Sequence, residues 1–294
     1  MLAISIIGAG RMGGALALAL DHAGYSIDNL VYRRIEPPPG LTTAFHRQPH
    51  VCKIDDLRSV SSDIIFVTTQ DSEIGVASKQ LEDLVQDSPA VFITSGALSS
   101  KSIENLKDRG CKTGSIHPLV SISDPITGAE QFTGVYFCVE GDSEAVAIAG
   151  SIVECLDGHS FSIPTDKKPL YHAAAVTSSG HLVALIDIAI GMLEKCGLEP
   201  TEGKKVLLPL VESTLDNLKE QALEASLTGT FARGDVETFN SHVTAIERDG
   251  SKDLLEIYLA LAARSVEIAE RAGRGSSSLD ELKERVLIAK RELR

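Results

Sequence analysis

The sequence has little of what marks a metalloprotein, a disulfide-bonded protein or a nucleic-acid-binding protein. Its five cysteines are widely separated, with no C-x-x-C pair and no metal-ligand spacing, so we expect no metal site and a reduced, cytoplasmic protein. No cluster of lysine and arginine stands out, and 41 acidic residues outnumber 28 basic ones, which gives a net charge of -13. Nucleic acid is therefore not an expected partner, because binding its phosphates needs a concentrated positive surface.

Long hydrophobic runs are also missing. The main apolar stretch of the second half, residues 182–193, contains Asp187 and falls well short of the roughly 20 residues that a membrane-spanning helix needs. The apolar residues 2–7 lack a positively charged flank and run directly into a glycine turn, unlike a cleaved signal. We expect no membrane span, and the 43% apolar content of the 294 residues is enough for two domains with separate cores.

The pattern of apolar residues changes between the two halves of the chain. In residues 1–163, short β-branched runs alternate with helix-like segments, which predicts parallel strands joined by right-handed crossovers. From residue 164 the apolar residues recur at helical spacing only. The sequence thus predicts a doubly wound α/β domain with a mostly parallel sheet at 1–163 and an all-α domain at 164–294. The expected strands are residues 3–7, 30–32, 64–68, 90–94, 114–117, 136–139 and 159–163, and the expected helices are 168–196, 203–225, 236–248, 254–272 and 279–293.

A glycine-rich motif follows the first predicted strand and opens a helix. In it, Gly8 permits a tight turn, Gly10 lets a pyrophosphate approach the backbone, and Gly13 allows close contact between helix and strand. The helix N-terminus favours the anion. The sequence therefore predicts a Rossmann-like, dinucleotide-binding domain; the alternative is a glycine turn that binds no nucleotide. The expected cofactor-binding residues of the motif are Gly8, Ala9, Gly10, Arg11, Met12 and Gly13.

The second predicted strand ends in Tyr32, Arg33 and Arg34. At this point an NAD-binding protein places an acid that accepts a hydrogen bond from the ribose 2′-hydroxyl. Two guanidinium groups suit a 2′-phosphate instead, because their planar forks bond phosphate oxygens bidentately. The pattern favours NADP over NAD; the alternative is a pair of solvated arginines.

Small polar residues and a histidine follow the next three strands. Thr68, Thr69 and Gln70 end one strand, and Ser95 and Gly96 follow the next. Open α/β sheets bind ligands outside the carboxyl ends of their strands, so we expect these residues to line the nicotinamide side of the site.

The strand after these ends near His117, which puts an imidazole at the same edge. It is placed to orient a substrate carbonyl or to donate a proton. The alternative is a structural histidine.

Lys168 and His172 are four residues apart at the start of the helical half, so they share one face of a helix, with Ser179 about two turns further on. Lysine, histidine and serine can share the tasks of charge stabilisation and proton donation that hydride addition to C=O or C=N requires. The alternative is a pair of residues that caps a buried helix. His172 lacks a carboxylate partner at metal-binding spacing, so no metal is expected.

With these motifs in place, the chain resembles a bacterial family along nearly its whole length. The family joins a Rossmann-like NADP-binding domain to a helical domain of unknown function, and its members are labelled NADP oxidoreductases or oxidoreductases of the deazaflavin-coenzyme type. The resemblance implies the fold and NADP as the cofactor, but no agreed substrate. The matching segments are residues 6–13, 94–98, 116–119, 124–125, 136–142, 168–175 and 232–235.

Two further families are more distantly similar. In pyrroline-5-carboxylate reductases the helical domain forms interlocked dimers and a serine-glycine segment contacts the substrate; Ser179 and Gly180 stand at the corresponding place, although His181 replaces that family's proline. β-Hydroxyacid dehydrogenases carry a catalytic Lys-x-x-x-Asn on the same helix, of which Lys168 keeps the lysine and His172 changes the partner.

These observations lead to one hypothesis and one rival. We expect an NADP-dependent oxidoreductase that moves a hydride between NADP(H) and a small C=O or C=N substrate, or a deazaflavin, in a cleft between the domains, with His117, Lys168, His172 and Ser179 as candidate catalytic residues. Because residues 182–193 are apolar nearly all round, that helix must be buried by several neighbours, and a homodimer through the helical domain is expected. The rival is a non-catalytic NADP(H)-binding dimer that senses cofactor state.

Overall fold

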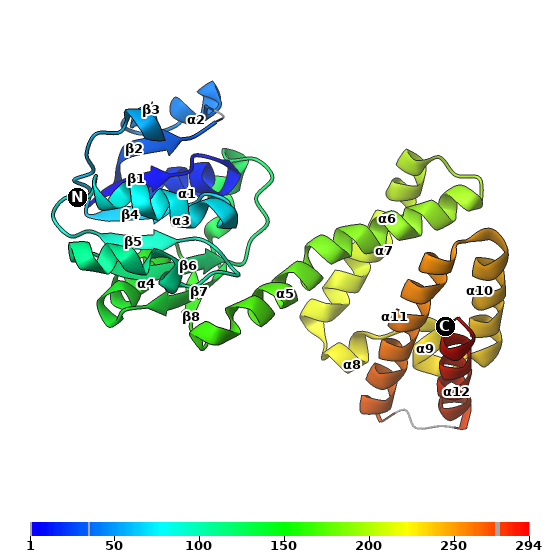
Figure 1. The fold of residues 1–294 in the computed structure, drawn as a ribbon. Helices are drawn as coiled ribbons and strands as arrows, with labels where there is room; N and C mark the ends of the chain where they lie inside the picture. Colours follow the sequence, from blue (N-terminus) through cyan, green and yellow to red (C-terminus); the bar gives the residue numbers. More distant parts are fainter. Residues whose placement is uncertain (1, 35, 274–276, 294) are drawn as a thin grey trace. The chain divides into compact units, whose positions relative to one another are not determined.

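The computed structural model describes residues 2–34, 36–273 and 277–293, which fall into two compact units, Met1–Ser179 and Gly180–Arg294 (Figure 1). The sequence placed the boundary between residues 163 and 164. The difference concerns one helix, α5 (Lys168–Ser178), which belongs to the first unit. Its first residue, Lys168, is tied to the sheet by hydrogen bonds, as described below.

The first unit is built on an eight-stranded sheet in the order β3-β2-β1-β4-β5-β6-β7-β8. Every neighbouring pair is parallel except β6 and β7, which are antiparallel. The predicted α/β class with a mostly parallel sheet is confirmed. The sequence missed only the short edge strand β3, whose four residues carry too little apolar pattern to mark a strand. The strands are β1 (Ala3–Ile7), β2 (Ser26–Tyr32), β3 (His50–Lys53), β4 (Ile64–Val67), β5 (Ala90–Ile93), β6 (Lys112–Pro118), β7 (Tyr136–Gly141) and β8 (His159–Phe161).

Both faces of this sheet are covered. In β4, Ile64 and Phe66 join one apolar core with α1 and α4, while Ile65 and Val67 join a second core with α3. All four side chains are at most 2% exposed, which explains why the strand is apolar throughout. The helices of this unit are α1 (Arg11–His22), α2 (Pro39–Thr42), α3 (Asp71–Glu82), α4 (Ser143–Cys155) and α5, with 3-10 segments η1 (Ile54–Asp56), η2 (Ser100–Arg109), η3 (Thr127–Phe132) and η4 (Thr165–Lys167).

All regular secondary structure in the described residues of the second unit is helical, as predicted. Phe239, Leu259 and Leu282 come from three different helices and are at most 1% exposed, so they form the centre of its core. The single helix predicted over residues 168–196 is divided at Ser179, whose backbone leaves the helical conformation. The helices of this unit are α6 (Gly180–Lys195), α7 (Pro200–Glu220), α8 (Leu223–Ser226), α9 (Gly229–Arg233), α10 (Val236–Asp249), α11 (Lys252–Arg271) and α12 (Ser277–Glu292).

Helix α6 lies outside the core of its unit. It packs along α7, but none of its residues is buried, and Val183 is 69% and Leu185 40% exposed. The sequence predicted that several neighbours bury this helix. The described residues of its own unit do not supply them, and α6 keeps an exposed apolar surface.

By length and composition alone, one described helical stretch could cross a membrane. It is Thr165–Lys195, with a mean hydropathy of 1.6 and 0% of the tested window buried. The prediction was based on residues 182–193 alone, whereas the helical stretch continues on both sides. The expectation that no segment is long enough to span a membrane is therefore corrected. One such helix is weak evidence of a span, because a helix from a protein core meets the same criteria.

Candidate functional site

The glycine turn after β1 is held by backbone contacts that leave no room for side chains. The amides of Gly8 and Ala9 donate to the carbonyl oxygen of Val31 in β2, at 2.8 and 3.0 Å. Gly8 has a φ of +117°, and a Cβ atom on Gly13 would lie 2.2 Å from the Gly8 oxygen. Thr68 Oγ1 donates to that same oxygen at 2.7 Å, which ties the turn to the end of β4. The predicted roles of Gly8 and Gly13 in turn and packing are therefore visible.

The outer side of this turn is open to an anion. A Cβ atom on Gly10 would meet nothing within 4 Å, and α1 begins at the next residue with no side-chain cap and no acid in its first turn. Amides at a helix N-terminus without a capping side chain are available to a phosphate. Of the other motif residues, Ala9 is buried, Met12 is half-buried and Arg11 is exposed beside the open face.

A pocket lies beside the turn. Apolar side chains from β1, β2 and α3 line it together with Tyr32, Arg33, Thr69 and Glu73. Thr69 Oγ1 is buried and has no hydrogen-bond partner among the described residues. A buried hydroxyl without a partner costs free energy, which makes Thr69 a candidate contact for a polar ligand atom.

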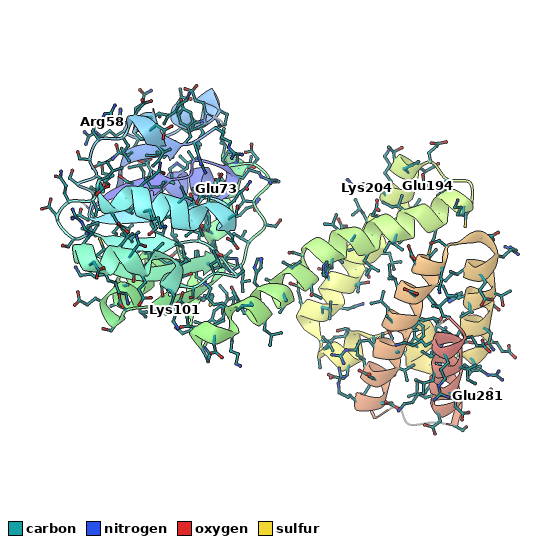
Figure 2. All side chains as sticks on the ribbon, in the orientation of Figure 1. Arg58, Glu73, Lys101, Glu194, Lys204 and Glu281 are labelled. Carbon is teal, nitrogen blue, oxygen red and sulfur yellow. The ribbon has the colours of Figure 1, made fainter. Side chains whose placement is uncertain are left out.

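The arginine pair does not stand alone. Arg33 Nη1 lies 2.8 Å from Glu73 Oε1, and Arg34 Nη2 lies 3.5 Å from the same oxygen. Glu73, labelled in Figure 2, comes from the first turn of α3. The sequence prediction did not include this acid, because no local signal links Glu73 to an arginine 40 positions earlier.

The polar residues after β4 and β5 shape the rim of the sheet. Gln70 is the residue before α3. Ser95 is buried, and its Oγ accepts hydrogen bonds from the amides of Ala97 and Leu98 at 3.2 and 2.8 Å, so it shapes the turn after β5. The side chain of Ser95 is therefore engaged by its own turn, while Gly96 is buried beneath neighbouring side chains.

Two imidazoles converge on Gly96. A Cβ atom there would lie 2.4 Å from His172 Nδ1 and 2.8 Å from His117 Nε2, and the ring centroids are 5.8 Å apart. His172 Nδ1 is buried without a hydrogen-bond partner in the described residues. The sequence predicted both histidines as site residues, and the structure brings them together at the carboxyl edge of the sheet.

His117 is neutral at physiological pH. Burial lowers its pKa to about 4, and the neighbouring Lys168 and His172 side chains act in the same direction. Its Nδ1 lies 2.6 Å from the hydroxyl of Tyr171, and burial raises the pKa of that hydroxyl, which therefore stays protonated and can donate. When the Tyr171 hydroxyl donates to Nδ1, the proton of the neutral ring is on Nε2, the atom that faces Gly96. The sequence argument missed Tyr171, although it stands next to His172.

Lys168 lies beneath this rim rather than on it. Its side chain is 0% exposed, and Nζ donates to the Ser95 carbonyl oxygen at 2.9 Å and to Ser115 Oγ at 2.5 Å. Glu140 Oε1 is 3.7 Å away and also accepts from the amide of Ser100. Burial lowers the pKa of Lys168, and the Glu140 carboxylate opposes that shift. This geometry favours a positioning role for Lys168, which fastens the start of α5 to the sheet.

Ser179 lies apart from the imidazoles. It is exposed at the far end of α5, seven residues after His172 and thus about 10 Å along the helix. Its Oγ donates to the carbonyl oxygen of Ala175 at 2.9 Å. The first unit alone gives Ser179 no place in the site.

Comparison with known families agrees with this architecture. Residues 1–118 match the model of a Rossmann-like domain, and residues 135–265 match that of DUF2520, a domain of unknown function. The chain therefore carries a Rossmann-like domain followed by a DUF2520 domain. No curated protein matches it.

Solved structures resemble the chain over nearly its full length. Protein TM1727 from Thermotoga maritima is 25% identical with a TM-score of 0.70, and the match covers 92% of this chain and 99% of that one. A provisionally named NADP oxidoreductase from Bacteroides fragilis is 20% identical with a TM-score of 0.72, covering 92% and 98%. The Plasmodium falciparum pyrroline carboxylate reductase, solved with NADP bound, is 14% identical with a TM-score of 0.57, covering 96% and 97%.

The positioning role of Lys168 predicts a large loss of stability in Lys168→Met. The variant leaves the Glu140 carboxylate buried without its cation, which costs about 3 to 5 kcal/mol. Urea denaturation measures this change. The matched control is Lys167→Met, whose side chain is 61% exposed and whose replacement should change stability by less than about 0.5 kcal/mol. Equal stability of the two variants would contradict the positioning role.

Proposed function

We propose that this chain is an NADP-dependent oxidoreductase that moves a hydride between NADP(H) and the C=O or C=N bond of a small substrate. One observation carries the proposal: an open glycine turn, an arginine pair and two converging imidazoles lie at the carboxyl edge of a single sheet. Ligands of such sheets bind at this edge. The names of the similar Bacteroides and Plasmodium proteins support NADP as the cofactor.

The residues present fit the cofactor. The open face at Gly10 and the amides that begin α1 would hold the pyrophosphate. Arg33 and Arg34 would bind the 2′-phosphate. The Thr69 hydroxyl, which has no partner among the described residues, would form a hydrogen bond to the ligand. When bound, the nicotinamide supplies or accepts the hydride.

The two imidazoles would act on the substrate. Reduction of C=O or C=N needs a hydrogen bond that stabilises charge on the heteroatom, and a proton. In this proposal the Nε2–H of neutral His117 donates that hydrogen bond, with Tyr171 holding the ring in the required tautomer. His172, whose Nδ1 has no hydrogen-bond partner in the described part of the chain, delivers the proton. Lys168 positions His172 through the first turn of α5.

Nucleotide affinity tests the cofactor. Calorimetric titration should show that NADPH binds at least about tenfold more tightly than NADH, or about 1.4 kcal/mol, because only NADPH offers a phosphate to the guanidiniums. The double variant Arg33→Ala/Arg34→Ala should lose that preference. The control Arg47→Ala/Arg58→Ala removes the same charge from exposed positions and should keep it. Absence of binding by either nucleotide would overturn the proposal.

Turnover tests the chemistry. NADPH oxidation should be screened with small ketones, aldehydes, cyclic imines and a deazaflavin. With any active substrate, His172→Leu should lower kcat by at least about 100-fold, the usual contribution of a positioned proton donor, while the Kd of NADPH changes less than about twofold. The control His50→Leu alters an exposed histidine on the opposite edge strand β3 and should keep full activity. Full activity of His172→Leu would remove it from the mechanism.

We also propose that a second copy of the chain covers α6, which makes the protein a homodimer through its helical domain. Val183 on α6 is 69% exposed, and Val206 and Leu210 on α7 are 56% and 66% exposed. Exposed apolar surfaces of this kind mark protein interfaces. An interlocked helical dimer is also what the resemblance to pyrroline-5-carboxylate reductases implies.

Sedimentation equilibrium tests the dimer. The wild type should have twice the chain mass of 31.3 kDa, and Val183→Glu/Leu210→Glu should be monomeric, because two carboxylates cannot be buried in an apolar interface without partners. The control Leu287→Glu/Ile288→Glu alters exposed apolar residues of α12 and should remain dimeric. A monomeric wild type, or flotation with phosphatidylcholine vesicles, would contradict the dimer.

A further inference from the structure

The Glu73 carboxylate lies against the arginine pair, where a phosphate bound by these arginines would also lie. One oxygen of its carboxylate, Oε1, accepts from Arg33 at 2.8 Å and lies 3.5 Å from Arg34. The Glu73 side chain is only 20% exposed, against 44% for Arg33 and 78% for Arg34. The carboxylate is thus the inner member of the cluster, and the guanidiniums are the outer ones.

We infer that Glu73 sets the preference between the two dinucleotides by opposing the 2′-phosphate. The inference rests on the proposed function, because it requires a dinucleotide in the pocket that Glu73 lines with Tyr32 and Arg33. In this arrangement the arginines provide the attraction that selects NADPH, and Glu73 limits it. The residue is therefore a specificity determinant outside the glycine motif.

The physical argument concerns like charges. A 2′-phosphate gains most from the arginines when their N–H groups point at its oxygens, but Glu73 already accepts from Arg33. A phosphate that displaces this contact still lies near a carboxylate, and the repulsion is only partly screened because Glu73 is mostly buried. A ribose with a free 2′-hydroxyl brings no negative charge to this point. The opposition is therefore selective for the phosphorylated cofactor.

Helix α3 holds the backbone of Glu73 in place. It belongs to the first turn of α3, and its backbone amide donates to the carbonyl oxygen of Gln70 at 2.8 Å. A negative charge in the first turn is also stabilised by the helix dipole. The backbone of Glu73 thus stays at the wall of the pocket, within side-chain reach of Arg33.

The test is Glu73→Gln, which keeps the size and an accepting oxygen but removes the charge. Calorimetry with NADPH, NADH and adenosine 2′,5′-bisphosphate should show that the Kd values of the two 2′-phosphorylated ligands fall at least about fivefold, or about 1 kcal/mol, while that of NADH changes less than about twofold. Glu73→Ala should shift the ratio in the same direction. The matched control is Asp83→Asn, an exposed acid at the other end of α3 and about 15 Å along the helix from Glu73, which should change none of the three.

Each outcome separates this inference from its rivals. If Glu73→Gln weakens NADPH binding, Glu73 holds Arg33 in place for the phosphate, and the inference is wrong. If it weakens NADH binding, Glu73 accepts from a ribose hydroxyl, and the inference is also wrong. If the wild type binds NADPH and the ratio of affinities is unchanged, the inference fails while the proposed function stands. If the wild type binds neither dinucleotide, both fail.

Discussion

The candidate site depends on one buried cation. Lys168 begins α5, and its ammonium group bonds Ser95 at the end of β5 and Ser115 in β6, with Glu140 from β7 close by. These contacts bind the helix to three neighbouring strands at their shared edge. Because α5 is a rigid element, fastening its first turn also fixes His172 one turn later, and so places that imidazole against His117. An ammonium group that is 0% exposed is well suited to this task, since moving it would leave the buried Glu140 carboxylate without its cation and would break the hydrogen bonds to Ser95 and Ser115.

Two glycines set a second constraint, which depends on the absence of a side chain rather than on a contact that a side chain makes. At Gly13 and Gly96, the neighbouring atoms come so close that any side chain would force them apart. Gly13 brings the start of α1 against the glycine turn, and Gly96 lets two imidazoles approach the backbone of the rim. Both contacts depend on the absence of a side chain, so they cost no side-chain entropy and add no flexible group to the site. Backbone atoms therefore define both the glycine turn and the rim where the imidazoles meet.

Sequence patterns revealed those parts of the protein that repeat or follow local rules. The alternation of β-branched and helical segments predicted the class of both units, and the spacing of Gly8, Gly10 and Gly13 located the turn. His117 was found because strand ends converge in a parallel sheet, and His172 because its spacing from Lys168 puts both on one face of a helix. Tyr171 and Glu73 were missed, since their importance lies in contacts with residues distant along the chain. The predicted burial of the helix around Val183 in a shared dimer core stays a prediction, because an apolar composition favours burial of a helix but does not identify what covers it.

The contact between Glu73 and Arg33 links stability to binding. In the free chain, the carboxylate relieves the repulsion between two adjacent guanidiniums, a benefit of no more than about 1 kcal/mol for groups this exposed. A phosphate bound to the same arginines would give a similar relief and would make the carboxylate a like charge. A negative charge at Glu73 therefore stabilises the free protein but opposes the phosphate in the bound protein. Because Glu73 lies outside the glycine turn and the sheet core, a change there can alter the balance without altering the fold, whereas Lys168 and Gly13 allow no such change.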